Sequence, residues 1–109
     1  PVIPVNREHA FMMFPIVIKD PAINRDKLCL YLEEKGIETR PLMPLLTQPV
    51  YRKMWGHLYK EYPVALEATT RGFYVGCHQK LTTEDIQYLG NTIMQGYQAV
   101  AARRLYAAA

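Results

Sequence analysis

The chain has 109 residues, half of them hydrophobic, which fits one folded domain and excludes a disordered segment. Its formal net charge is +3, and the basic residues are scattered singly except for the pairs Arg52–Lys53 and Arg103–Arg104. Proteins that bind nucleic acid gather basic residues on one face or in one run, so no nucleic-acid partner is expected. No stretch reaches the ~20 apolar residues of a membrane span, and no signal peptide opens the chain, so we expect a cytoplasmic protein without a membrane partner.

Several kinds of chemical site are excluded by what the sequence lacks. There is no serine, hence no serine nucleophile, and the six glycines are isolated, so no glycine-rich phosphate loop is present. The histidines have no metal-ligand spacing, and no metal site is expected. Cys77 and His78 are adjacent, but neighbours in a strand point to opposite faces, which argues against a catalytic pair. With Cys29 as the only other cysteine, the chain predicts reduced thiols.

The first predicted element is a strand. Residues 10–18 form a continuous apolar run, short enough for a strand buried on both faces. Pro15 interrupts this run and cannot donate a hydrogen bond to a sheet ladder. We therefore expect the strand to lie at a sheet edge or to contain a bulge.

A capped helix and a second strand follow. Asn24 can cap a helix from Arg25 to Lys35, which Gly36 ends. Residues 37–40 then predict a short strand closed by Pro41. Together these elements begin an α/β pattern in which strands and helices alternate.

The segment from Leu42 to Tyr51 is an unusual loop. It contains two prolines and no charged residue, whereas loops are ordinarily polar because they face water. Such a loop must be covered by its own core, by a partner surface or by a ligand. A short helix is expected within residues 48–56.

The last part of the chain predicts two helices around a third strand. Pro63 suits the first position of a helix that runs to Arg71 and ends at Gly72, and residues 73–77 predict a strand. Thr82 and Asp85 form a capping-box pattern at the start of a long helix, where Leu81 can contact Ile86. The apolar stripe expected to face the core is Ile86, Leu89, Ile93, Tyr97 and Val100. The predicted fold is a small three-stranded α/β sandwich, with its sheet covered by helices.

The order of several short motifs resembles the C-terminal small domain of the DegT/DnrJ/EryC1/StrS family, the pyridoxal-phosphate-dependent fold-type-I sugar aminotransferases. The resemblance covers residues 9–98. It rests on the segments Arg25-Asp26-Lys27-Leu28 with Leu32, Gly36-Ile37, Thr39-Arg40, Gln48-Pro49 with Tyr51, Pro63-Val64-Ala65, Leu81-Thr82 and Glu84-Asp85-Ile86. The chain departs from the family pattern at Leu42 and Leu46, where many members carry histidine or an aromatic residue, and this leaves the sugar undefined.

The resemblance implies a domain without its own cofactor. In the family, a lysine in a large N-terminal domain binds pyridoxal phosphate, and the small domain lines the substrate cleft. None of the six lysines lies in a comparable motif, so this chain alone is expected neither to bind the cofactor nor to transaminate. The implied partners are the large domain of the same polypeptide, a nucleotide-sugar substrate and a second subunit of a homodimer.

Three residues are candidates for substrate contact. Arg40 ends a strand beside the apolar loop, where its guanidinium could bind a sugar-nucleotide phosphate or instead form a structural ion pair, for example with Glu38. Tyr51 could stack on a sugar or be a core aromatic residue. His78 lies where the third strand meets the last helix. No residue is expected to be catalytic.

Two readings of the whole chain remain open. Residues 1–106 are expected to form the small domain of an aminotransferase, with residues 107–109 a remnant of cloning. Alternatively, the chain is a free-standing α/β regulatory module that binds a small metabolite or a protein without catalysis. The reading frame upstream of Pro1 distinguishes the two, because only the enzyme requires a preceding domain with a lysine motif.

Overall fold

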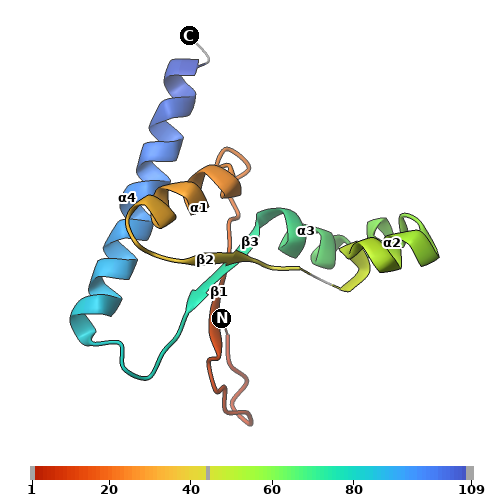
Figure 1. Cartoon of the computed structure of the whole chain (residues 1–109), viewed down its shortest axis with the longest axis horizontal. Coiled ribbons are helices and arrows are strands. Elements are labelled where there is room, and N and C mark those ends of the chain that lie inside the picture. Colours follow the sequence, from red (N-terminus) through yellow and green to blue (C-terminus); the bar gives the residue numbers. More distant parts are fainter. Residues whose placement is uncertain (1, 44, 108–109) are drawn as a thin grey trace.

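A computed structural model describes residues 2–43 and 45–107, without the side chains of Leu46 and residues 103–107. Three strands form one antiparallel sheet flanked by helices, which confirms the predicted α/β class (Figure 1). In chain order, the elements are β1 (Met13–Val17), α1 (Arg25–Glu34), β2 (Thr39–Pro41), the 3-10 helix η1 (Leu45–Thr47), α2 (Pro49–Trp55), the 3-10 helix η2 (Leu58–Glu61), α3 (Pro63–Arg71), β3 (Gly72–Gly76) and α4 (Thr83–Ala107).

The sheet has the order β1-β3-β2, so β3 is its central strand. β1 is an edge strand, as the proline within it predicts, and Pro15 lies opposite Tyr74. The expectation that the first strand is buried on both faces is wrong at Phe14, which is 39% exposed. The reason is that the Phe14 side chain borders a hollow at the end of the sheet.

The core lies between one face of the sheet and the helices α1 and α4. Phe73 and Val75 of β3 are buried against Leu28 and Leu32 of α1. Leu89, Ile93, Tyr97 and Val100 of α4 pack around this cluster, which confirms most of the predicted stripe. Figure 1 shows α4 crossing α1 beside the sheet.

The ends of α1 explain where the second strand begins. Asn24 caps the helix as predicted, because its Oδ1 accepts a hydrogen bond of 2.9 Å from the Lys27 N–H. At the other end, Gly36 has a φ of 79°, and the Ile37 N–H donates to the Leu32 carbonyl over 2.9 Å. Ile37 is thus bound to the helix end, and β2 begins at Thr39 rather than at residue 37.

The start of α4 has the predicted capping box, but the predicted apolar stripe does not begin at Ile86. The Thr82 N–H donates to Asp85 Oδ2 over 2.9 Å, and Thr82 Oγ1 accepts a hydrogen bond from the Asp85 N–H. Ile86, however, is 56% exposed and does not join the core. The first turns of α4 extend beyond the part of the sheet that the core covers, so Ile86 borders the same hollow as Phe14.

Residues 42–62, which we name the apolar arm, project from the sheet through η1, α2 and η2 (Figure 1). No described residue of α2 or η2 is buried. Its most exposed apolar side chains are Met43, Leu45, Val50 and Met54. The projection agrees with a radius of gyration of 16.1 Å, against roughly 13 Å for a compact domain of this length. The core of this domain therefore leaves Met43, Leu45 and Val50 of the apolar loop uncovered.

Candidate functional site

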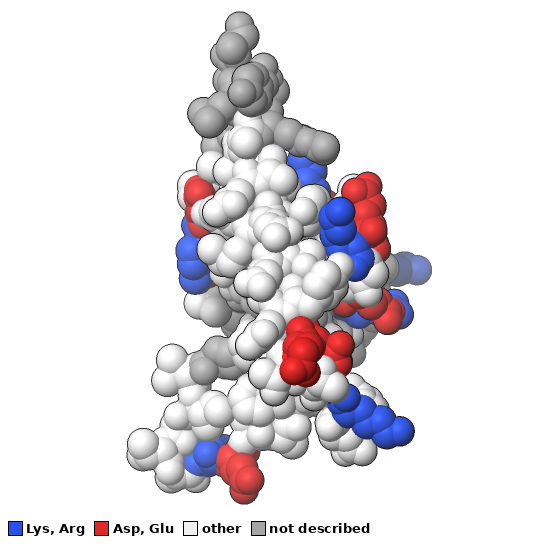
Figure 2. Space-filling view, turned by 90° about the vertical axis from the view of Figure 1, so that its left-hand side faces the viewer, with Lys and Arg blue, Asp and Glu red and all other residues white. Residues whose placement is uncertain are grey.

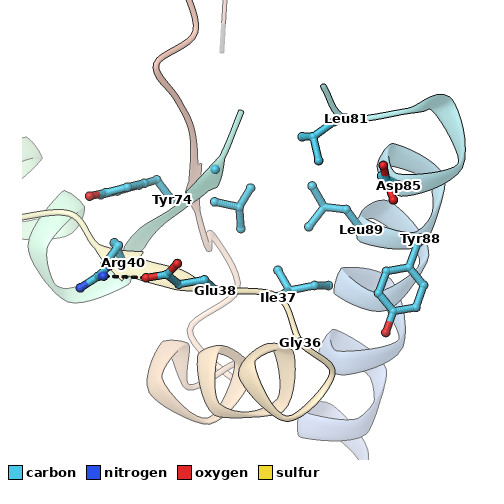
Figure 3. A pocket seen from close by; sticks show the side chains of 11 residues that line it. Gly36, Ile37, Glu38, Arg40, Tyr74, Leu81, Asp85, Tyr88 and Leu89 are labelled. Atoms are coloured by element: carbon cyan, nitrogen blue, oxygen red, sulfur yellow. Dashed lines mark hydrogen bonds and ion pairs between the residues drawn. The ribbon is translucent and has the colours of Figure 1, made fainter. Parts of the chain in front are cut away.

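A groove of about 580 Å³ lies between the β2 edge of the sheet and the first turns of α4. We name it the polar groove; its lining residues include Glu38, Arg40, Tyr74, Leu81, Asp85 and Tyr88. In Figure 3, Arg40, Glu38 and Tyr74 form one side, and Leu81, Asp85 and Tyr88 lie on the other. Its charged side chains come from two elements that are distant in the sequence.

Arg40 occupies the sheet side of the polar groove. Residues two apart in an extended chain point to the same face, and Arg40 Nη2 accordingly forms an ion pair with Glu38 Oε1 at 2.6 Å. Arg40 also lies opposite Tyr74 in the sheet register. The Arg40 and Glu38 side chains are 64% and 74% exposed. Because exposed ion pairs contribute only about 0–1 kcal/mol, the guanidinium can exchange Glu38 for another anion.

The helix side of the polar groove is fixed by hydrogen bonds. The backbone N–H and the hydroxyl of Thr82 both donate to the Asp85 carboxylate. These hydrogen bonds, chiefly the one from the N–H, lower the pKa of Asp85 below its usual value. The Tyr88 hydroxyl donates to the Lys35 carbonyl over 2.9 Å and ties α4 to the end of α1. This wall therefore presents a carboxylate that is ionised at neutral pH.

A second depression of about 1030 Å³ adjoins the polar groove and shares Val75, Gly76, Leu81 and Leu89 with it. We name it the apolar hollow; its lining residues include Phe11, Met12, Phe14, His78, Ile86 and Ile93. No Asp, Glu, Lys or Arg is among its described lining residues. The two neighbouring depressions thus differ sharply in charge.

The three candidate residues do not converge on one point. Arg40 lines the polar groove and His78 lines the adjoining apolar hollow, where its Nδ1 accepts a hydrogen bond from the Lys80 N–H over 3.1 Å. Tyr51 lies in α2, stacked on Trp55 at a ring distance of 5.1 Å, and lines neither depression.

Sequence reasoning missed part of the polar groove and misplaced one strand end. Glu38 could have been predicted, because it stands two residues before Arg40 in an extended segment. Asp85 and Tyr88 reach the polar groove only because α4 packs beside the sheet. The third strand ends at Gly76 rather than at residue 77, so Cys77 lies outside it and is exposed. Cys77 and His78 therefore do not alternate as neighbours within a strand.

The described residues do not fit a pyridoxal-phosphate site of their own. All six lysines are exposed, and none lines the polar groove or the apolar hollow. A Schiff-base lysine requires a desolvated amine, whereas these six side chains are exposed to solvent. Within residues 2–43 and 45–107, no cluster of His, Cys, Asp and Glu could hold a metal ion. Over the same ranges, no helix combines the length and apolarity needed to cross a bilayer.

Comparisons with known proteins support the family resemblance. The model of the DegT/DnrJ/EryC1/StrS aminotransferase family matches residues 1–94. The GDP-perosamine synthase of Escherichia coli O157:H7 is 30% identical over 90 residues, covering 82% of this chain and 23% of that protein. A Streptococcus pneumoniae protein described as a sugar aminotransferase, solved in its PMP form, shares the fold with a TM-score of 0.71 at 21% identity, covering 81% of this chain and 22% of that one. Although it spans less than a quarter of either relative's length, the chain belongs to the DegT/DnrJ/EryC1/StrS aminotransferase family.

Proposed function

We propose that this chain is the C-terminal small domain of a pyridoxal-phosphate-dependent aminotransferase that acts on a nucleotide-linked keto-sugar. The catalytic lysine and the cofactor belong to a large domain of the same polypeptide, so residues 1–106 alone are inactive. The small domain contributes a wall of the substrate cleft, and the whole enzyme is a cytoplasmic homodimer. Family membership supports the reaction class, and a relative named for a GDP-linked sugar supports the nucleotide-linked substrate.

The polar groove is the observation that carries this proposal. Its single arginine, Arg40, is held by an exposed and therefore weak pair with Glu38. A guanidinium binds the oxygens of a phosphate with two parallel hydrogen bonds. The carboxylate of Asp85, across the groove, can accept hydrogen bonds from sugar hydroxyls. A nucleotide-linked sugar presents both kinds of group.

The test is Arg40→Ala in the full-length enzyme, assayed with its nucleotide sugar. We expect kcat/KM to fall by about tenfold or more while cofactor absorbance is unchanged. Lys27→Ala is the matched control, because Lys27 is also an exposed cation but lines neither depression. Unchanged kinetics with lower thermal stability would assign Arg40 to structure instead.

The regulatory-module alternative makes a different prediction. A module should bind its ligand as residues 1–109 alone, and its reading frame should contain no preceding lysine-bearing domain. Titration of this chain with nucleotide sugars, read by calorimetry, separates the two proposals. Tight binding by the chain alone, without transaminase activity in the natural gene product, would favour the module.

A further inference from the structure

We infer that the apolar hollow is the surface on which the large domain of the proposed enzyme packs. The inference rests on the proposed function and assigns the two neighbouring depressions different roles. The polar groove faces the substrate, and the apolar hollow is filled by apolar side chains of the large domain.

The chemistry of the apolar hollow favours a protein surface over a small polar ligand. Around it Met12 is 79% exposed and Ile86 56% exposed, with Phe14 and Leu81 each at 39%. Exposed apolar surface costs about 25 cal/mol per Å², and monomeric proteins rarely leave large patches of it uncovered. The centres of protein interfaces are likewise depleted of charged residues.

The low charge continues along the helix that forms one side of the hollow. Residues 86–102 of α4 contain no Asp, Glu, Lys or Arg. Figure 2, which views the molecule from the side of α4, shows a largely uncharged face above the acidic first turn. A solvated helix face ordinarily carries charged residues, so this side of the domain is suited to contact with another protein surface.

The N-terminal segment identifies the large domain as the occupant. The chain covers only 22–23% of the two relatives, so most of a full-length enzyme lies outside it. In the proposed enzyme the large domain precedes this chain in the sequence. Residues 2–10, which are exposed throughout, then connect the large domain to β1. That segment leads directly to Phe11 and Met12, which form a wall of the hollow.

Local contacts fix the end of this segment, at Phe11, beside the hollow. Phe11 adopts a positive φ of 45°, and its N–H donates to His9 Nδ1 over 2.8 Å. The Phe11 ring lies 6.3 Å from the ring of Phe14 and nearly parallel to it. The chain thus turns at Phe11 beside the hollow, and the segment that would lead back to a preceding domain starts there.

Cys77 supplies a natural probe, because it lines the apolar hollow and is exposed in this chain. In a Cys29→Ala background, we expect a thiol reagent to modify Cys77 at least about tenfold more slowly in the full-length enzyme than in residues 1–109, with the labelled peptide identified by mass spectrometry. A cysteine replacing Lys27, exposed on α1 outside the hollow, should react at equal rates in both. Equal rates at Cys77 would overturn the inference.

A charge substitution gives a second, independent readout. Ile86→Asp should lower the melting temperature of the full-length enzyme, whereas Leu30→Asp, at a similarly exposed apolar position of α1 outside the hollow, should not. Transaminase activity of the unaltered enzyme keeps the two proposals apart. An active enzyme with unprotected Cys77 refutes the docking surface alone, and an inactive enzyme with protected Cys77 refutes the proposed function alone.

Discussion

Gly96 of α4 lies against the ring of Tyr31 in α1, so closely that no side chain fits between them. A Cβ atom at Gly96 would stand 2.6 Å from Tyr31 Cδ1 and 2.8 Å from Cδ1 of the buried Leu28. We expect Gly96→Ala to destabilise the chain, because overpacking of about 1–3 kcal/mol exceeds the ~1 kcal/mol that alanine gains in a helix. Thermal unfolding followed by circular dichroism measures the change.

Gly90 provides the matched control, six residues earlier in the same helix. A Cβ at Gly90 would meet nothing within 4 Å. Gly90→Ala should therefore stabilise the 109-residue chain by about 1 kcal/mol through helix propensity alone, and so raise its melting temperature. If both variants are stabilised, the close packing of α4 on α1 at Gly96 is wrong.

The capping box at the start of α4 predicts a pH dependence. Hydrogen bonds from Thr82 lower the pKa of Asp85 in the folded state, so ionised Asp85 stabilises folding above its unfolded pKa. This contribution is lost as the pH falls through the folded pKa. Between about pH 5 and pH 3, the melting temperature of Asp85→Asn should fall less than that of the unaltered chain. Glu84→Gln removes an adjacent carboxylate outside the box and should follow the unaltered chain; parallel curves for all three would contradict the prediction.

Local signals in the sequence were sufficient for most of the fold. The helix caps at Asn24 and Thr82, and the edge position of Pro15, each depend on residues close together in the chain. Whether a residue is buried in the tertiary structure was harder to predict from the sequence. The exposure of Ile86 depends on where α4 extends beyond the sheet, which helical periodicity does not encode.

The candidate site shows the same division. The neighbours Glu38 and Arg40 are readable from strand alternation, but Tyr74 faces Arg40 only through the β2–β3 register. Arg25, which belongs to one of the motifs behind the family resemblance, has a structural role. Its Nη1 donates to the Gly72 carbonyl over 2.7 Å and fixes the start of β3 against α1.

The pair of Glu38 and Arg40 predicts an opposite effect for its two members in the full-length enzyme. Arg40→Ala removes the proposed phosphate ligand, whereas Glu38→Gln releases the guanidinium from a competing carboxylate 2.6 Å away. We expect Glu38→Gln to lower KM for the nucleotide sugar by about two- to fivefold, since exposed pairs contribute at most about 1 kcal/mol. The gain should vanish in an Arg40→Ala background. A gain that persists without Arg40 would show that Glu38 acts on the substrate directly.

The exposure of every lysine predicts how residues 1–109 respond to pyridoxal phosphate. Labelling should be slow and spread over several amines, because no described lysine lies in either depression. Borohydride trapping followed by peptide mass spectrometry measures the distribution. A stoichiometric adduct on one lysine would mean that this chain forms a cofactor site by itself, contrary to the proposed division between two domains.

The apolar arm predicts self-association of the isolated chain. Val50 and Met54 are one helical turn apart in α2 and 57% and 61% exposed, so they form one apolar ridge that the domain leaves uncovered. At about 25 cal/mol per Å², pairing such ridges from two molecules is favourable, and sedimentation velocity should show a mass that rises with concentration. Val50→Lys with Met54→Lys should restore a monomer. Gln98→Lys, which adds charge at an exposed position of α4, should leave the association unchanged. If the Gln98 variant alone restores the monomer, the chains associate through the uncharged face of α4 and not through the apolar arm.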